Sequence, residues 1–381
     1  MRRILILPAG LSLLAAIDAG LFRIGWPFFL PQAELPLAHG PLMVCGFLGT
    51  LIGLEKAVAL QKWWAYLEVM ATAVGGIGLV AATHATLPRV LFFLGSLGLA
   101  LVSATFFWRH RTDANACVLA GAVLWSFGCV LFLLGWPIFA VAPAWMGFLL
   151  LTIAGERLEL NRLLRPSRSS RAAFFLAVGL ALAAIALAGI GFTRAGEVVL
   201  FDEGARYSSP VFDPAVRLFG FSCAAIGLWL LSNDMARIAW RKPGLSRFMA
   251  VSLLAGYAWL TLSGTLSMLL GAVVAGDAYD AVLHSFFLGF VFSMIFAHGP
   301  VILPAILSRA LEFHPVFYVP LALLHAGLVL RISGDFTDHS GARPWGGLLN
   351  AVAIVTFLLI AVLRMAQRAT IAAGNTSITS R

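Results

Sequence analysis

Twelve long apolar stretches occupy almost the whole of this 381-residue chain, and they constrain its fold more than any other feature. A helix needs roughly 20 apolar residues to cross the hydrocarbon core of a membrane. The stretches are continuous rather than alternating in polarity, which favours helices over a transmembrane barrel. Because 61% of the residues are hydrophobic and 11% are charged, little chain remains for a separate soluble domain. The sequence therefore predicts an all-α integral membrane protein, a bundle of twelve transmembrane helices.

These stretches form one predicted polytopic membrane domain over residues 1–368. The tail, 369–381, is rich in Thr, Ser, Ala and Gly and is expected to be disordered. The longest loop between spans, 193–213, is interpreted as an ordinary polar connection, with a lid or a docking surface as the alternative. The spans are expected near 4–25, 36–55, 64–83, 89–108, 115–135, 138–158, 172–192, 214–233, 248–271, 281–307, 314–333 and 346–366.

Positive charges alternate between the two sides of this predicted bundle. Of the 26 Lys and Arg residues, 19 lie at the termini or in loops that follow even-numbered spans. Loops rich in Lys and Arg stay in the cytoplasm, so both termini are expected there. The net charge of +9 thus reflects orientation and does not indicate nucleic-acid binding. The partner that composition predicts is the lipid bilayer.

Two histidines begin spans that run in the same direction. His39 begins the second span and His284 begins the tenth, so both are expected at similar depths in the exterior half of the membrane. Ionisable side chains are costly in a bilayer and mark functional sites. A neutral imidazole binds haem iron or copper well, and Met43 and Cys45 nearby would suit copper. We therefore predict His39 and His284 as ligands of one b-type haem, with copper as an alternative.

Two further histidines complete the candidate metal ligands. His298 follows His284 by fourteen residues, which places it about 21 Å deeper and within about 40° of the same helix face. Ala-His-Gly-Pro surrounds both His39 and His298, which keeps their pairing open, and Gly and Pro are expected to loosen the helix there. His325 is expected near mid-membrane. Each of these residues alone also has a simpler interpretation, a buried histidine that bonds to a neighbouring helix.

Two acidic residues close spans that resemble one another. Glu55 and Glu156 end the segments FLGTLIGLEK and FLLLTIAGER, which align without gaps 101 residues apart. This similarity favours an internal repeat of four spans, in which spans two, six and ten are equivalent. The two carboxylates are candidates for a proton or cation site. The simpler interpretation is salt bridging, of Glu55 with Lys62 or of Glu156 with Arg157 and Arg162.

The topology resembles that of the catalytic subunit of haem–copper oxidases and nitric oxide reductases, with three four-helix units and histidines on spans two and ten. Size, composition and the segments HGPLM (39–43) and LHSFFLGFVFSMIFAHGP (283–300) are similar to those of the NnrS family. The resemblance implies haem and copper, a bacterial inner membrane, a role in nitric oxide stress, and a small gas or an electron-transfer protein as partner. Spans six and seven carry no histidine, whereas the oxidases hold copper there, so oxygen reduction is not expected.

Two functions are the main candidates on the sequence, beside a third alternative, an assembly factor or scaffold without a ligand. The first is a membrane haem-binding protein with a redox or nitric oxide role. The second is a proton- or cation-coupled secondary transporter, which a helix broken at Gly299 and Pro300 and an intramembrane Glu55 would suit.

Overall fold

The computed structural model describes residues 2–378 apart from 28, 31–33, 165, 194–195, 202–203 and 338–340. Within that part of the chain, eleven helices are long and apolar enough to cross a membrane. The third predicted span corresponds to α4, Ala65–Ala81, which is shorter at 17 residues. The all-α bundle is thus confirmed, while the described residues contain eleven full-length candidate spans rather than twelve.

Nine of the long helices are simple α-helices. They are α1 (Arg2–Arg23), α5 (Thr86–Arg109), α6 (Asp113–Leu133), α7 (Ile138–Asn161), α8 (Arg168–Thr193), α9 (Phe212–Asn233), α11 (Leu245–Leu270), α14 (Tyr318–Asp335) and α15 (Ala342–Ile378). Short helical turns complete the connections, namely α10 (Ala236–Ala239), η3 (Arg162–Leu164) and η5 (Pro315–Phe317).

The second and tenth spans are composite and share one distortion. The second consists of η1 (Leu35–Ala38), α2 (His39–Pro41), the π-helical η2 (Leu42–Gly49) and α3 (Thr50–Leu60). The tenth consists of α12 (Asp277–His284), the π-helical η4 (Ser285–Phe292) and α13 (Ser293–Leu307). In both spans the wide turns follow the predicted ligand histidine, and π-helical turns are frequent at functional sites.

The expected loosening at Gly-Pro is found in one span only. In the second span Pro41 directly precedes η2. In the tenth span α13 continues through Gly299 and Pro300, so the helix is not broken there. This corrects the prediction on which part of the transporter argument depended.

Spans two, six and ten are the most buried helices of the bundle. In their most apolar 18 residues, 67%, 78% and 67% of positions are buried, against 50% or less in the other eight long spans. These three spans carry His39, Glu156 and His284. The predicted polar residues therefore lie on the helices that the rest of the bundle surrounds.

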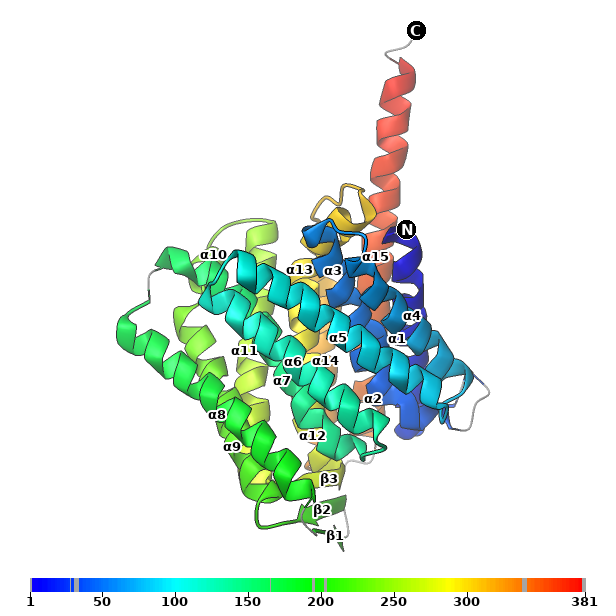
Figure 1. Ribbon diagram of the computed structural model, residues 1–381. Coiled ribbons are helices and arrows are strands. Elements are labelled where there is room, and N and C mark those ends of the chain that lie inside the picture. The colour runs from blue at the N-terminus through cyan, green and yellow to red at the C-terminus, as the bar shows by residue number, and fades with distance from the viewer. Residues whose placement is uncertain are drawn as a thin grey trace.

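The two ends of the bundle differ in structure. Both termini and α10 lie at one end, and a small sheet lies at the other (Figure 1). The sheet consists of β1 (Glu197–Phe201), β2 (Gly204–Ser208) and β3 (Val273–Gly276), antiparallel in the order β1-β2-β3. It corrects the prediction of an ordinary loop at 193–213, although residues 194–195 and 202–203 lie outside the described residues. We call the two ends the terminal end and the sheet end.

The C-terminal helix projects from the terminal end of the bundle (Figure 1). Helix α15 continues to Ile378, ten residues past the predicted end of the membrane domain. Residues 379–381 lie outside the described residues, and the disorder expected for 369–381 stays a prediction.

Close helix packing depends on glycine pairs. On α9 and α11, a Cβ at Gly220 would lie 2.7 Å from the carbonyl oxygen of Gly264. On α14 and α15, a Cβ at Gly346 would lie 2.6 Å from the carbonyl oxygen of Gly327. Small residues let helix backbones approach closely, which is how helices associate in a membrane where burial of apolar surface contributes little.

Candidate functional site

The structure brings His39 and His284 together, although they are 245 positions apart in the sequence. Their ring centroids lie 6.3 Å apart, with an angle of 32° between the ring planes. His39 begins α2 and His284 ends α12. Helix α12 also packs against β3, so the pair lies in the half of the bundle toward the sheet end. We call these two residues the histidine pair.

Each ring of the pair has one nitrogen held by a backbone carbonyl. Nδ1 of His39 lies 2.7 Å from the carbonyl oxygen of Ala16 on α1. Nδ1 of His284 lies 3.0 Å from the carbonyl oxygen of Asp280. A carbonyl oxygen only accepts hydrogen bonds, so Nδ1 must carry the proton in both neutral rings. The lone pair is then on Nε2, the arrangement that metal-bound histidines use.

The separation of the two rings suits a shared metal ion. With metal–nitrogen bonds of about 2.0 Å and ring nitrogens roughly 1.1 Å from their centroids, two imidazoles on opposite sides of one ion have centroids about 6 Å apart. The observed 6.3 Å agrees with that value. Both residues are half-buried. The donor set therefore fits a two-imidazole centre of the kind that holds haem iron or copper.

Space for the His39 ring comes from the first helix. A Cβ at Gly20 would lie 2.7 Å from Cε1 and 2.9 Å from Nδ1 of His39. Any larger residue at position 20 would therefore displace the imidazole. Ala16 and Gly20 are four residues apart on α1, so one face of this helix both accepts the hydrogen bond and accommodates the ring.

A network of charged residues holds His284. Oδ1 of Asp280 lies 3.2 Å from Nδ1 of His284, and both carboxylate oxygens of Asp280 accept hydrogen bonds from Arg331, each at 2.7 Å. Arg343 is ion-paired with Asp277 and lies 3.3 Å from Asp335. Sequence reasoning missed Asp280, although its position four residues before His284 on a helix predicts their contact.

His298 lies apart from the histidine pair. Its Nδ1 is 2.8 Å from the carbonyl oxygen of Met294, one turn earlier on α13. It lies within electrostatic range of Glu156, Arg157 and Asp234, which belong to the terminal half of the bundle. The alternative pairing of His39 with His298 is therefore not found.

His325 has a hydrogen-bonding role that opposes metal binding. Nε1 of Trp259 donates to Nδ1 of His325 over 3.0 Å, and the two rings are stacked. Because Nδ1 accepts, the proton of the neutral ring is on Nε2, which is buried without a partner among the described residues. No lone pair is then left for a metal. The described residues also gather no cluster of three or more His, Cys, Asp or Glu side chains suited to a metal ion.

The two predicted acidic residues meet around a lysine. Nζ of Lys56 lies 2.6 Å from Oε1 of Glu156 and 3.9 Å from Oε1 of Glu55. The salt bridges expected with Lys62, Arg157 and Arg162 are not the ones formed, because α3 and α7 bring the equivalent ends of the two similar segments together. The ammonium group already occupies the place that a transported cation would take between the carboxylates.

Arg157 has a different partner, which the sequence did not predict. Its Nε and Nη2 each donate to Asp234 over 2.8 Å, and the hydroxyl of Tyr257 donates to the same carboxylate over 3.1 Å. Asp234 is fully buried and Arg157 is 4% exposed. The 77 positions between the two residues explain why no local pattern indicated the pair.

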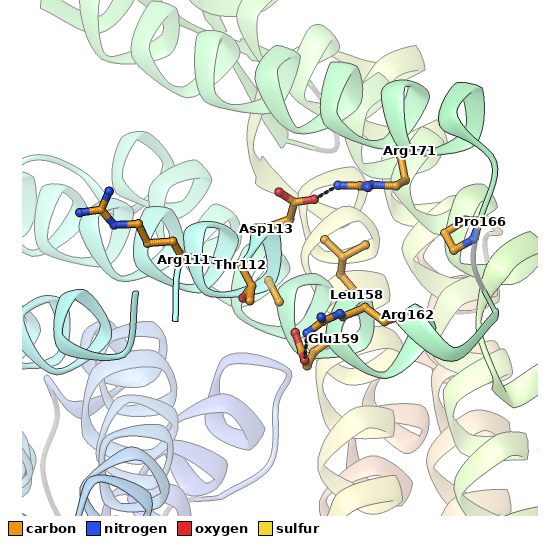
Figure 2. Close-up of a pocket in the computed structure, with 9 residues that line it drawn as sticks. Arg111, Thr112, Asp113, Leu158, Glu159, Arg162, Pro166 and Arg171 are labelled. Carbon is orange, nitrogen blue, oxygen red and sulfur yellow. Dashed lines mark hydrogen bonds and ion pairs between the residues drawn. The ribbon is translucent and has the colours of Figure 1, made fainter. Parts of the chain in front are cut away.

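A surface pocket of about 470 Å³ lies at the ends of α6, α7 and α8 (Figure 2). Three arginines line it, but Arg171 is paired with Asp113 and Arg162 with Glu159. The Arg111 side chain points away from the other labelled residues and stacks on Trp108, 4.9 Å from the ring centroid (Figure 2). Two of the three arginines are thus already paired with carboxylates.

Comparison with known proteins gives one match. A family model described as a domain of unknown function (DUF8744) matches residues 2–366. No curated protein and no solved structure matches the chain.

Proposed function

Since the chain belongs to the DUF8744 family of unknown function, we propose from its site alone that it is a membrane haem-binding protein with a redox or nitric oxide role. His39 and His284 would hold the haem iron. One observation carries the proposal: two imidazoles on different helices lie 6.3 Å apart, and each is held through Nδ1 with Nε2 left for iron.

The protein's own residues would position and tune this centre. A bound haem would supply one-electron redox chemistry and affinity for small gases. Ala16 and Gly20 hold the His39 ring, while Asp280 orients His284. A carboxylate behind a ligand histidine makes the imidazole more basic and fixes its tautomer. Asp280 would therefore favour the oxidised state of the iron.

The wider architecture agrees with the proposed resemblance to the NnrS family and the oxidase subunit. Spans two, six and ten are the most buried, as three four-helix units around a common centre require. Both termini lie at one end of the bundle (Figure 1). Together with the charge pattern, this supports twelve helical segments in a bacterial inner membrane with cytoplasmic termini.

An optical spectrum of the purified full chain, expressed with sufficient haem, tests the proposal directly. We expect a Soret band and the spectrum of low-spin, six-coordinate haem, because two imidazoles give a strong ligand field. Metal analysis of the same sample separates the alternatives, since stoichiometric copper without a Soret band would indicate a copper centre at the same pair. A sample with neither haem nor copper would refute the proposal.

Asp280→Asn is expected to weaken haem binding by about 10- to 100-fold, the usual effect of removing an outer partner of a metal ligand. The substitution keeps the size of the side chain but removes the charge behind His284. Haem titration of the apoprotein measures the effect. Asp277→Asn is the matched control, because Asp277 lies on the same helix and pairs with Arg343, whereas Nδ1 of His284 bonds to Asp280. Equal losses in both variants would contradict a specific role for Asp280.

A further inference from the structure

Glu68 is a buried acid that the site described above does not use. It lies one turn into α4 and is 3% exposed. Both carboxylate oxygens are buried and have no hydrogen-bond partner among the described residues. A Cβ at Gly53 of α3 would meet this carboxylate, and a Cβ at Gly98 of α5 would meet the Cβ of Glu68. The acid is therefore enclosed by helices on two sides.

The helices packed on Glu68 bring no compensating charge to it. Lys56 of α3 is ion-paired with Glu55 and with Glu156. The arginines of α5, Arg89 and Arg109, lie at its two ends, and α1 has no ionisable residue between Arg3 and Asp18. No Lys or Arg of the described part of the chain is ion-paired with Glu68. An ionised carboxylate in such a place is very costly, and a bound proton removes that cost.

A metal ion would need more oxygens than this place offers. Sodium, calcium and magnesium ions take about six oxygen ligands. The described part of the chain gathers no cluster of three or more His, Cys, Asp or Glu side chains around Glu68. The two oxygens of one carboxyl group suit a proton instead.

Hydroxyl groups continue from Glu68 into the bundle. Thr72 lies one turn further along α4 and bonds to Thr50. One turn before Thr50 in the second span, a Cβ at Gly46 would lie 2.8 Å from Oγ of Ser12 on α1. This Ser12 oxygen is buried without a partner among the described residues. One turn beyond Ser12, the carbonyl of Ala16 accepts the hydrogen bond of His39. Residues with polar groups thus recur about one helical turn apart, a rise of about 5.4 Å, from Glu68 to the histidine pair.

We propose that Glu68 is a proton-binding site inside the bundle, and that Thr72, Thr50 and Ser12 form the route along which its proton exchanges. Gaps of one turn between these hydroxyls are of the size that single water molecules bridge in buried polar positions. The inference does not depend on haem, so it stands or falls separately from the proposed function.

Infrared spectra of the full chain in lipid nanodiscs test this site. We expect a carbonyl band of a protonated carboxylic acid at neutral pH that is absent in Glu68→Gln and displaced in Glu68→Asp. The band should shift after transfer to D₂O. Glu159→Gln is the control, since Glu159 is an exposed acid paired with Arg162 and should contribute only a carboxylate band.

Thr72→Val tests the route. It keeps the shape of the side chain and removes the hydroxyl, so the band should remain while its exchange with D₂O slows at least tenfold. Identical spectra of the wild type and both Glu68 variants would show that Glu68 holds no proton and would overturn the proposal. A band that never shifts in D₂O would also overturn it, and unchanged exchange in Thr72→Val would overturn the route.

Discussion

Alanine in place of His39 or His284, one substitution at a time, is expected to remove the low-spin haem spectrum of the purified protein. Each ring supplies one of the two proposed ligands, and the two rings lie 6.3 Å apart. Removing either ring therefore removes half of the proposed ligand set. The loss of haem affinity should exceed the roughly 100-fold that marks the upper range for outer partners of a ligand. Absorbance spectra and haem titrations measure both effects.

Two other histidines provide controls for this experiment. His298→Ala and His325→Ala should keep the wild-type spectrum, because His298 belongs to the terminal half and His325 accepts a hydrogen bond from Trp259. Added imidazole should restore the low-spin spectrum of His39→Ala, because the lost ring leaves a space beside Gly20. A wild-type spectrum in both His39→Ala and His284→Ala would disprove axial ligation by this pair.

The depth of the candidate histidines in the membrane could be predicted from the sequence, whereas the direction in which each side chain faces could not. The rise per residue of a helix places His39 and His284 at matching depths once the spans are known. The π-helical η2 and η4 follow these histidines, and their wider turns rotate every later residue, including His298, relative to an ideal α-helix. Composition and periodicity contain no information on such turns, so the sequence alone left the pairing of His39 with His298 open.

The features that the sequence did not reveal are the burial of a residue or the pairing of a strand by segments far away in the chain. Glu68 lies near the start of a predicted span, where an acid is ordinarily interfacial. It is buried because Gly53 and Gly98 let two neighbouring helices pack closely against it. Strand β3 likewise pairs with β2 across more than 60 positions. Helices were predictable because a chain in lipid must satisfy its backbone hydrogen bonds locally. The sheet and the buried acid follow from packing that no local pattern records.

The largest loss of stability is expected from Asp234→Asn. This carboxylate is fully buried and accepts two hydrogen bonds from Arg157, one from Tyr257 and one from the backbone nitrogen of Ala236. Removing its charge leaves a buried guanidinium without a counter-ion, which costs about 3–5 kcal/mol. Thermal or denaturant unfolding of the detergent-solubilised protein measures the difference.

Two further variants show whether charge or shape accounts for that loss. Asp113→Asn should cost at most about 1 kcal/mol, because Asp113 and Arg171 form an exposed pair that water screens. The double variant Arg157→Met with Asp234→Leu should recover most of the stability, since removing both charges also removes the cost of burying them. If the double variant were as unstable as Asp234→Asn, the hydrogen-bonded shape of the Arg157–Asp234–Tyr257 cluster would matter more than its charge balance. If Asp234→Asn cost no more than Asp113→Asn, the guanidinium of Arg157 would have to reach water in the variant, and the junction of α7, α9 and α11 would be more adaptable than its packing indicates.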